Sequence, residues 1–282
     1  MEHEITTIWP INYDGFLSND RFEHVFGGTI SKLNGLLSGR KGSKDLERRR
    51  DPLGRLFKSV RRYHHEGHGF ARDWEAFRLG LLGLDLEALR TDSSDTYRNF
   101  RRVYAKLTFN EFFGWRHEVR IAALLATRRV PYLKTEAPDF KIAMGTGDVY
   151  AECTSTNITS ARPDTDLGYK LRNAVSAKSQ KPYCNRHTML LLDYTNVLHN
   201  SILGGRPLEP ETVSGVVSAL FPATNFGGIL ATALLADLQN RRFVMAGALQ
   251  IADDAPSTIS ELLDAVGIGT GRDVLYTVPF SV

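Results

Sequence analysis

The chain has 282 residues, of which 42% are hydrophobic and 24% are charged, so it can bury a sizeable core and is not a disordered tail. It contains no run of about 18 uncharged apolar residues, and its N-terminus lacks the basic, apolar and small-residue order of a signal peptide, so we expect neither membrane insertion nor secretion. Its two cysteines, Cys153 and Cys184, are too few for a disulfide framework. These features together favour a cytoplasmic protein.

The positive charge of the chain is concentrated in one segment. The formal net charge is only +3, but ten basic and three acidic residues lie between Arg40 and Arg62, which gives that segment a net charge of +7. Such a segment can neutralise phosphate groups, although a solvated surface segment would have the same composition. The candidates for nucleic-acid binding are Arg48, Arg49, Arg50, Arg55, Lys58, Arg61 and Arg62.

The first third of the chain is predicted to be mainly helical. Apolar residues recur at three- and four-residue spacing within residues 20–39 and 73–90, and basic or glycine-containing connections join these segments. The pattern changes near residue 105, where we place a domain boundary. The boundary divides a basic, mainly helical region (1–105) from a nuclease-like α/β domain (106–282).

The second region alternates helical and extended patterns. In chain order, we expect a helix over residues 110–128, two strands that meet at a glycine-containing turn, a helix over 163–181, a buried strand that begins at Thr188, and apolar segments that begin at Gly227 and Arg241. The segment that begins at Arg241 has a clearer strand pattern than the one that begins at Gly227. The expected fold class is therefore α/β, with a mixed sheet flanked by helices.

The helix over residues 110–128 carries an acid within its apolar face. The residues three and four positions from Glu118 are Gly114, Trp115, Ile121 and Ala122. A buried carboxylate is costly unless it is paired, hydrogen-bonded or bound to a metal. Glu118 is therefore a candidate metal ligand, with an ion pair to an arginine as the alternative.

Two further acids lie on the predicted hairpin. Asp139 and Lys141 share one face of the first strand, and Glu152 and Thr154 share one face of the second. A two-residue loop would place Asp139 opposite Glu152 or Thr154, so that these side chains converge, whereas a three-residue loop would separate them. Because neighbouring carboxylates repel each other unless a divalent cation lies between them, convergence predicts a Mg²⁺ or Mn²⁺ site.

This segment resembles the PD-(D/E)XK nuclease superfamily, which includes many restriction and repair endonucleases. The residues that carry the resemblance are Pro138-Asp139-Phe140, Glu152-Cys153-Thr154 after the glycine-rich turn, and Glu118 on the preceding helix. The order of elements over about a third of the chain also matches the family core. The resemblance implies a restriction endonuclease-like αβββαβ core, a metal ion held by Asp139 and Glu152 with help from Glu118, and hydrolysis of nucleic acid.

One position departs from the family pattern. The family has a lysine two residues after the second acid, and this chain has Thr154, whose hydroxyl cannot supply a positive charge. Lys178 continues the apolar stripe of the next helix and should face inward, so it is the first candidate for the missing cation. Lys141 and Lys170 are the second and third candidates. The residues with expected supporting roles in the same groove are Thr154, Gln180 and Tyr183.

The sequence thus predicts a metal-dependent nuclease that acts on nucleic acid, with DNA favoured over RNA. The resemblance alone implies a role in restriction or defence. The alternative is a nucleic-acid-binding or scaffold module on a nuclease core that has lost catalysis, for which Thr154 is the indication. A homodimer would suit an enzyme that cuts both strands of a duplex.

Overall fold

A computed structural model describes residues 16–37, 50–156, 167–203, 210–237, 242–268 and 273–277. The fold is mixed α/β, as the sequence predicts, with a helical unit followed by a sheet unit. The helical unit ends at Thr127 and the sheet unit begins at Arg128, so the division falls after the long helix and not near residue 105. None of the helices in the described ranges has the length and apolar character needed to cross a membrane.

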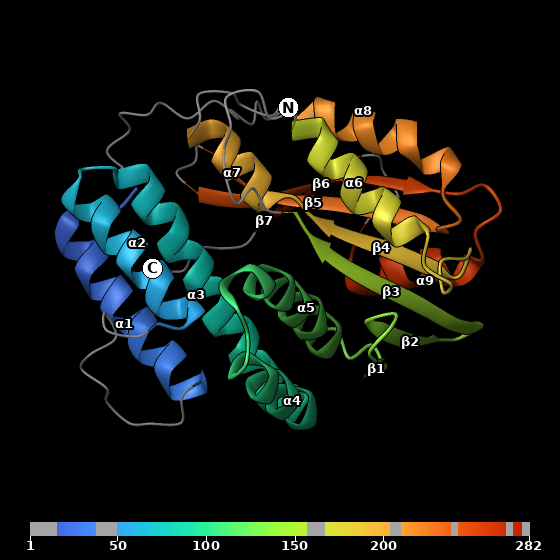
Figure 1. The fold of residues 1–282 in the computed structure, drawn as a ribbon. Helices are drawn as coiled ribbons and strands as arrows, with labels where there is room; N and C mark the ends of the chain where they lie inside the picture. The colour runs from blue at the N-terminus through green and yellow to red at the C-terminus, as the bar shows by residue number, and fades with distance from the viewer. Residues whose placement is uncertain are drawn as a thin grey trace. The chain divides into compact units, whose positions relative to one another are not determined.

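The helical unit is built around one long, mostly buried helix (Figure 1). Its described helices are α1 (Asn19–Leu37), α2 (Pro52–His65), α3 (Gly69–Asp92), α4 (Ser94–Tyr104) and α5 (Phe109–Thr127). Helix α3 packs against each of the other four. The apolar side chains that α1 and α3 bury account for the helical spacing seen in the sequence.

Helix α2 occupies part of the segment that the sequence analysis treated as a basic connection. Asp51 caps the helix, because its carboxylate accepts a hydrogen bond from the backbone N–H of Gly54 at 2.9 Å, and Pro52 takes the first helical position. The face turned to the core consists of Leu53, Leu56, Phe57 and Val60. The basic residues from Arg55 to Arg62 therefore lie on a regular helix.

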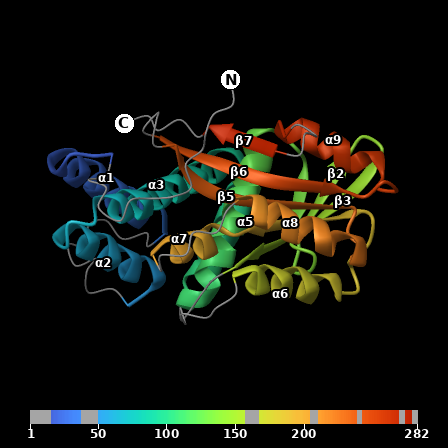
Figure 2. The same ribbon diagram turned by 90° about the horizontal axis from the view of Figure 1, so that it is seen from above.

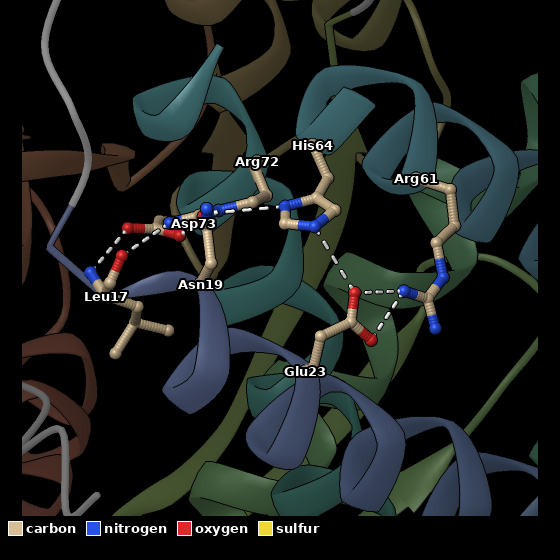
Figure 3. A network of polar contacts seen from close by, with 7 residues as sticks. All are labelled: Leu17, Asn19, Glu23, Arg61, His64, Arg72 and Asp73. Atoms are coloured by element: carbon tan, nitrogen blue, oxygen red, sulfur yellow. Dashed lines mark hydrogen bonds and ion pairs between the residues drawn. The ribbon is translucent and has the colours of Figure 1, made fainter. Parts of the chain in front are cut away.

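A buried ion pair fixes the start of α1 against α3 (Figure 3). Arg72 and Asp73 are each 2% exposed, and Arg72 Nε lies 2.8 Å from Asp73 Oδ1. The second carboxylate oxygen accepts the N–H of Leu17, while Arg72 donates to the Leu17 carbonyl and to Asn19 Oδ1. Burial raises the pKa of Asp73, and the hydrogen bond from Arg72 opposes that change.

The sheet unit contains one seven-stranded sheet among the described residues, and its strands follow sequence order. The strands are β1 (Tyr132–Lys134), β2 (Phe140–Met144), β3 (Gly147–Ser155), β4 (Thr188–Asp193), β5 (Gly228–Asp237), β6 (Arg242–Ile251) and β7 (Asp273–Thr277). The pairs β3–β4 and β4–β5 are parallel, and the other neighbours are antiparallel. All six residues of β4 are buried, as expected for a strand between parallel neighbours.

Helices connect and cover the strands of this unit (Figure 2). They are α6 (Leu167–Ser179), α7 (Thr195–Leu203), α8 (Pro210–Leu220), the short 3₁₀ helix η2 (Phe221–Ala223) and α9 (Ser257–Val266). Helix α6 packs against β3 and α8, whereas α9 packs against β2 and β3. The succession α5, β1, β2, β3, α6, β4 has the order of helix, three strands, helix and strand that the resemblance implies, and β1 is added to the two strands expected from the residue pattern.

The hairpin between β2 and β3 has the two-residue loop that the sequence left open. Met144 pairs with Gly147, so only Gly145 and Thr146 form the loop, and Gly147 takes a positive φ of 155°. Phe140 pairs with Ala151, which places the preceding residue, Asp139, opposite Glu152. The loop therefore brings the two predicted acids to the same level of the sheet.

Candidate active site

Asp139 is held at the entrance of β2 by two hydrogen bonds. Its Oδ2 atom accepts the backbone N–H of Cys153 at 2.7 Å, and its Oδ1 atom accepts the ammonium group of Lys134 at 3.1 Å. The side chain is 13% exposed. Because Cys153 directly follows Glu152 on β3, the first of these bonds ties Asp139 to the strand that carries the second acid.

Glu152 is the more buried of the two acids. It lies in β3, between β2 and β4, and its side chain is only 5% exposed. The ammonium group of Lys178, in the last turn of α6, donates a hydrogen bond to Glu152 Oε1. A buried carboxylate needs a partner of this kind, and the packing of α6 on β3 supplies it.

Tyr183 also contacts this carboxylate from the segment that follows α6. A hydrogen bond joins its side chain to Glu152. Burial raises the pKa of Tyr183 well above its ordinary value of 10.0, and the bond to Glu152 and the negative charges of Glu152 and Asp139 act in the same direction. The phenol is therefore protonated at neutral pH and donates a hydrogen bond to Glu152. Both acids therefore raise the pKa of the same hydroxyl.

Lys134 is a member of the site that sequence reasoning missed. It ends β1, it is 15% exposed, and it forms an ion pair with Asp139. Its ammonium nitrogen also lies 5.1 Å from the ring centroid of Phe140. The pairing of β1 with β2, and the turn between them, bring Lys134 to Asp139. No periodic pattern in the sequence indicates that contact.

These contacts define an acid–lysine cluster. Its members are Lys134, Asp139, Glu152, Lys178 and Tyr183. Each acid has an ammonium partner from a different element, because Lys134 comes from β1 and Lys178 from α6. The second of these partners is the residue that the sequence ranked first as the missing cation.

Lys141 and the other predicted lysine occupy different surroundings. Lys141 forms an ion pair with Asp148 across the hairpin at 2.8 Å, where both side chains are exposed. That bond, and then the charge of Asp148, raise the pKa of Lys141. Lys170 is half-buried on α6, about two turns before Lys178. Neither lysine has a described contact with Asp139 or Glu152.

The remaining predicted residues are placed as follows. Thr154 is half-buried on β3, two residues beyond Glu152, and Gln180 is exposed just after the end of α6. Glu118 is half-buried on α5, which belongs to the helical unit, whereas Asp139 and Glu152 belong to the sheet unit. The acid–lysine cluster is therefore described from the sheet unit alone.

The donor set of the cluster fits one kind of metal ion. Within the described part of the chain, no three His, Cys, Asp or Glu side chains lie close enough together to hold a metal. Mg²⁺ and similar cations, however, commonly use one or two protein carboxylates and complete their coordination with water and phosphate oxygens. Asp139 and Glu152 suit a cation bound in that way, and they do not suit a site made entirely of protein ligands.

The predicted nucleic-acid contacts lie mainly on one face of α2. Arg55, Lys58 and Arg62 are exposed, and their spacing of three and four residues places them in a row opposite the buried face. We call this row the α2 stripe. Arg50 is exposed just before the helix, while Arg48 and Arg49 lie outside the described residues.

Arg61 does not belong to the α2 stripe, because its guanidinium group forms an ion pair with Glu23 of the same unit (Figure 3). Its guanidinium group donates to both carboxylate oxygens of Glu23, with Nη1 2.6 Å from Oε2. It also lies 5.4 Å from the ring centroid of Phe26. Arg61 therefore joins α2 to α1 and contributes less positive charge to the surface than its neighbours do.

No protein-family model and no curated protein matches this chain. The function of the site must therefore be inferred from its own residues. The sheet unit holds two acids at the same level of paired strands, each with a lysine partner, and the helical unit displays a row of cations on an exposed helix face.

Proposed function

We propose that the protein is a metal-dependent nuclease that hydrolyses phosphodiester bonds in nucleic acid, with DNA as the favoured substrate and Mg²⁺ or Mn²⁺ as the cofactor. The observation that carries the proposal is the contact between Lys178 and Glu152. It places a cation beside the second acid from helix α6, where strand β3 offers only Thr154. The arrangement restores the combination of two acids and one ammonium group that phosphodiester hydrolysis uses.

Each residue of the cluster has a distinct part in this proposal. Mg²⁺ or Mn²⁺ held by Asp139 and Glu152 would lower the pKa of a bound water and stabilise negative charge on the phosphate. Lys178 would neutralise the charge that develops on the phosphate oxygens during attack. The phenol of Tyr183 orients Glu152, and the N–H of Cys153 orients Asp139.

The partner and the cellular setting belong to the same proposal. The α2 stripe supports binding to a phosphate backbone, since three exposed cations follow one another along a rigid helix. Neither cysteine forms a disulfide and both are buried, which is in keeping with a cytoplasmic location. A homodimer would allow two such sites to cut both strands of a duplex, as in restriction or defence.

The second candidate function is a nucleic-acid-binding or scaffold protein with a nuclease-like core that does not cleave. One observation favours it. Lys134 and Lys178 form ion pairs with Asp139 and Glu152, and these pairs neutralise both carboxylates. If the lysines hold the acids permanently, the cluster stabilises the fold and performs no chemistry.

The two functions differ in a cleavage assay. The purified protein is incubated with supercoiled plasmid, single-stranded DNA and RNA in Mg²⁺, Mn²⁺ or EDTA, beside the variants Asp139→Asn and Glu152→Gln. Asp264→Asn is the matched control, because Asp264 is an exposed acid on α9. We expect metal-dependent cleavage of DNA that both cluster variants lose and the control retains. DNA binding without cleavage by the wild-type protein would favour the scaffold, and cleavage retained by both cluster variants would overturn the nuclease.

A further inference from the structure

Helix α4 carries a group of cations that the sequence analysis did not single out. Residues 96–108 include Arg98, Arg101, Arg102 and Lys106 but no acid. The three arginines fall within about a third of the helix circumference, since successive residues are about 100° apart. All four basic residues are exposed. This part of the unit therefore presents concentrated positive charge to solvent.

Little of this charge is neutralised by neighbouring acids. Arg98, whose side chain is 70% exposed, forms an ion pair with Asp95. Arg102 donates to the neutral side chain of Asn99 at 2.9 Å. Among the described residues no acid forms an ion pair with Arg101, Arg102 or Lys106. The second half of α4 and the turn after it thus retain their positive charge.

The end of α4 also lies next to the start of α2. The hydroxyl of Tyr104, in the last turn of α4, donates to Oδ2 of Asp51, which is the residue that caps α2, at 3.0 Å. At the start of α5, the ring centroid of Phe109 lies 5.4 Å from the guanidinium carbon of Arg55, the first member of the α2 stripe. These contacts bring the C-terminal end of α4 and the turn after it close to the N-terminal end of α2, where the α2 stripe begins at Arg55.

The other face of α4 packs into the interior of the helical unit. Tyr97, Phe100 and Tyr104 are buried, and the Tyr97 hydroxyl donates to the carbonyl of Leu36 at 2.6 Å. An amphipathic helix that inserts into a membrane surface needs an apolar face that can enter the lipid, and the apolar face of α4 is buried in the unit. A ligand with a repeating negative charge and no apolar surface fits the exposed side better.

From these observations we propose that Arg101, Arg102 and Lys106, together with the α2 stripe, form one surface that binds the phosphate backbone of duplex DNA. The inference rests on the proposed function, because it takes nucleic acid to be the substrate, and it adds α4 to the substrate-binding surface. The planar guanidinium groups suit phosphate oxygens. Their fixed spacing on two joined helices suits a duplex, whose phosphates are also fixed in position.

The test measures binding separately from cleavage. A fluorescein-labelled DNA duplex is titrated in EDTA at several salt concentrations with the wild-type protein and with the variant Arg101→Gln/Arg102→Gln/Lys106→Gln. The matched control, Arg21→Gln/Lys32→Gln/Arg90→Gln, loses the same charge from exposed positions on α1 and α3. Glutamine is a good helix former, and circular dichroism checks that each variant is folded.

We expect the α4 variant to bind the duplex more weakly and with a smaller salt dependence. If each lost cation neutralises one phosphate, the slope of log K against log salt should fall by about 0.9 per cation, or by about 2 to 3 in total. The control should retain the wild-type slope. Equal slopes for the α4 variant and the wild type, or an equal loss in the control, would overturn the inference. Tight binding of an acidic peptide without binding of the duplex would also overturn it.

The outcome can be distinguished from that of the cleavage assay. Binding that depends on α4, from a protein that cleaves nothing, would support this inference and contradict the proposed hydrolysis. Metal-dependent cleavage by a protein whose duplex binding does not depend on the α4 cations would support the hydrolysis and overturn this inference.

Discussion

The ammonium group of Lys178 contacts the carboxylate of Glu152 although 26 residues separate them in the chain. The acid belongs to a strand inside the sheet, and the lysine belongs to the helix that crosses over from β3 to β4. The two residues can meet only when α6 is packed on β3. A cation supplied in this way need not come from the position two residues after the acid.

The first prediction concerns the charge of Lys178. Lys178→Met should lower the cleavage rate by about 10²-fold or more, because a group that stabilises charge in the transition state is lost, while duplex binding in EDTA stays near the wild-type value. Lys170→Met, on the same helix, should keep its activity. Single-turnover cleavage and fluorescence anisotropy measure the two quantities. Equal losses of activity in both variants would contradict the role assigned to Lys178.

The second prediction concerns Lys134 and the metal ion. Because the ammonium group of Lys134 and a divalent cation compete for the carboxylate of Asp139, Lys134→Met should bind Mn²⁺ more tightly than the wild-type protein does. The rise in melting temperature on addition of MnCl₂ measures this, since a ligand stabilises the state that binds it. Lys141→Met is the control, as Lys141 pairs with Asp148. A weaker response of Lys134→Met to Mn²⁺ would argue against competition.

The third prediction compares a buried and an exposed ion pair in the helical unit. Asp73→Ala should lower the free energy of unfolding by about 3–5 kcal/mol, because Arg72 would stay buried without its partner and the start of α1 would lose two hydrogen bonds. Asp95→Ala, which breaks the exposed pair with Arg98, should cost about 1 kcal/mol or less. Urea unfolding of both variants provides the comparison. Similar costs would mean that Arg72 finds another partner.

The fourth prediction concerns pH. Burial lowers the pKa of His64 below 6.5, and the charge of Arg72 does the same, while Glu23 opposes them (Figure 3). The unfolded chain therefore takes up a proton first as the pH falls, so the contribution of neutral His64 to stability is present above about pH 6.5 and is lost below it. The difference in unfolding free energy between the wild type and His64→Gln should shrink between about pH 8 and about pH 5. A constant difference would contradict the direction of this pKa change.

Sequence patterns predicted the sheet unit well, because its elements have strong local signatures. The apolar run from Thr188 became β4, and strand periodicity placed the two acids on a hairpin, whereas the two-residue loop that sets them at the same level was one of two possibilities in the sequence. The inward face of α6 led to Lys178 for the same reason. By contrast, the contact of Lys134 with Asp139 depends on how the three-residue strand β1 pairs with β2. A strand of that length is too short to show a periodic pattern in the sequence.

In the helical unit, charge obscured the pattern. The buried residues of α2 have clear helical spacing, but the surrounding cations made the segment resemble a connection. The separate environment of Arg61 could not be predicted either. Its partner, Glu23, lies 38 residues away on α1, and only the packing of the two helices brings them together. Contacts of this kind follow from tertiary structure rather than from local sequence.

The two acids lie in or next to strands of the sheet, whereas Lys178 belongs to helix α6, and these elements differ in local stability. Strand β3 is hydrogen-bonded on both sides, to β2 and to β4, whereas α6 covers the sheet and exposes several residues of its last two turns. A covering helix opens at a smaller free-energy cost than a strand inside a sheet, so the amide protons of α6 should exchange with solvent before those of β3. A partial opening of this kind would remove Lys178 while both acids remain in place. Mild heat or denaturant would then abolish the activity of the site while the sheet is still folded.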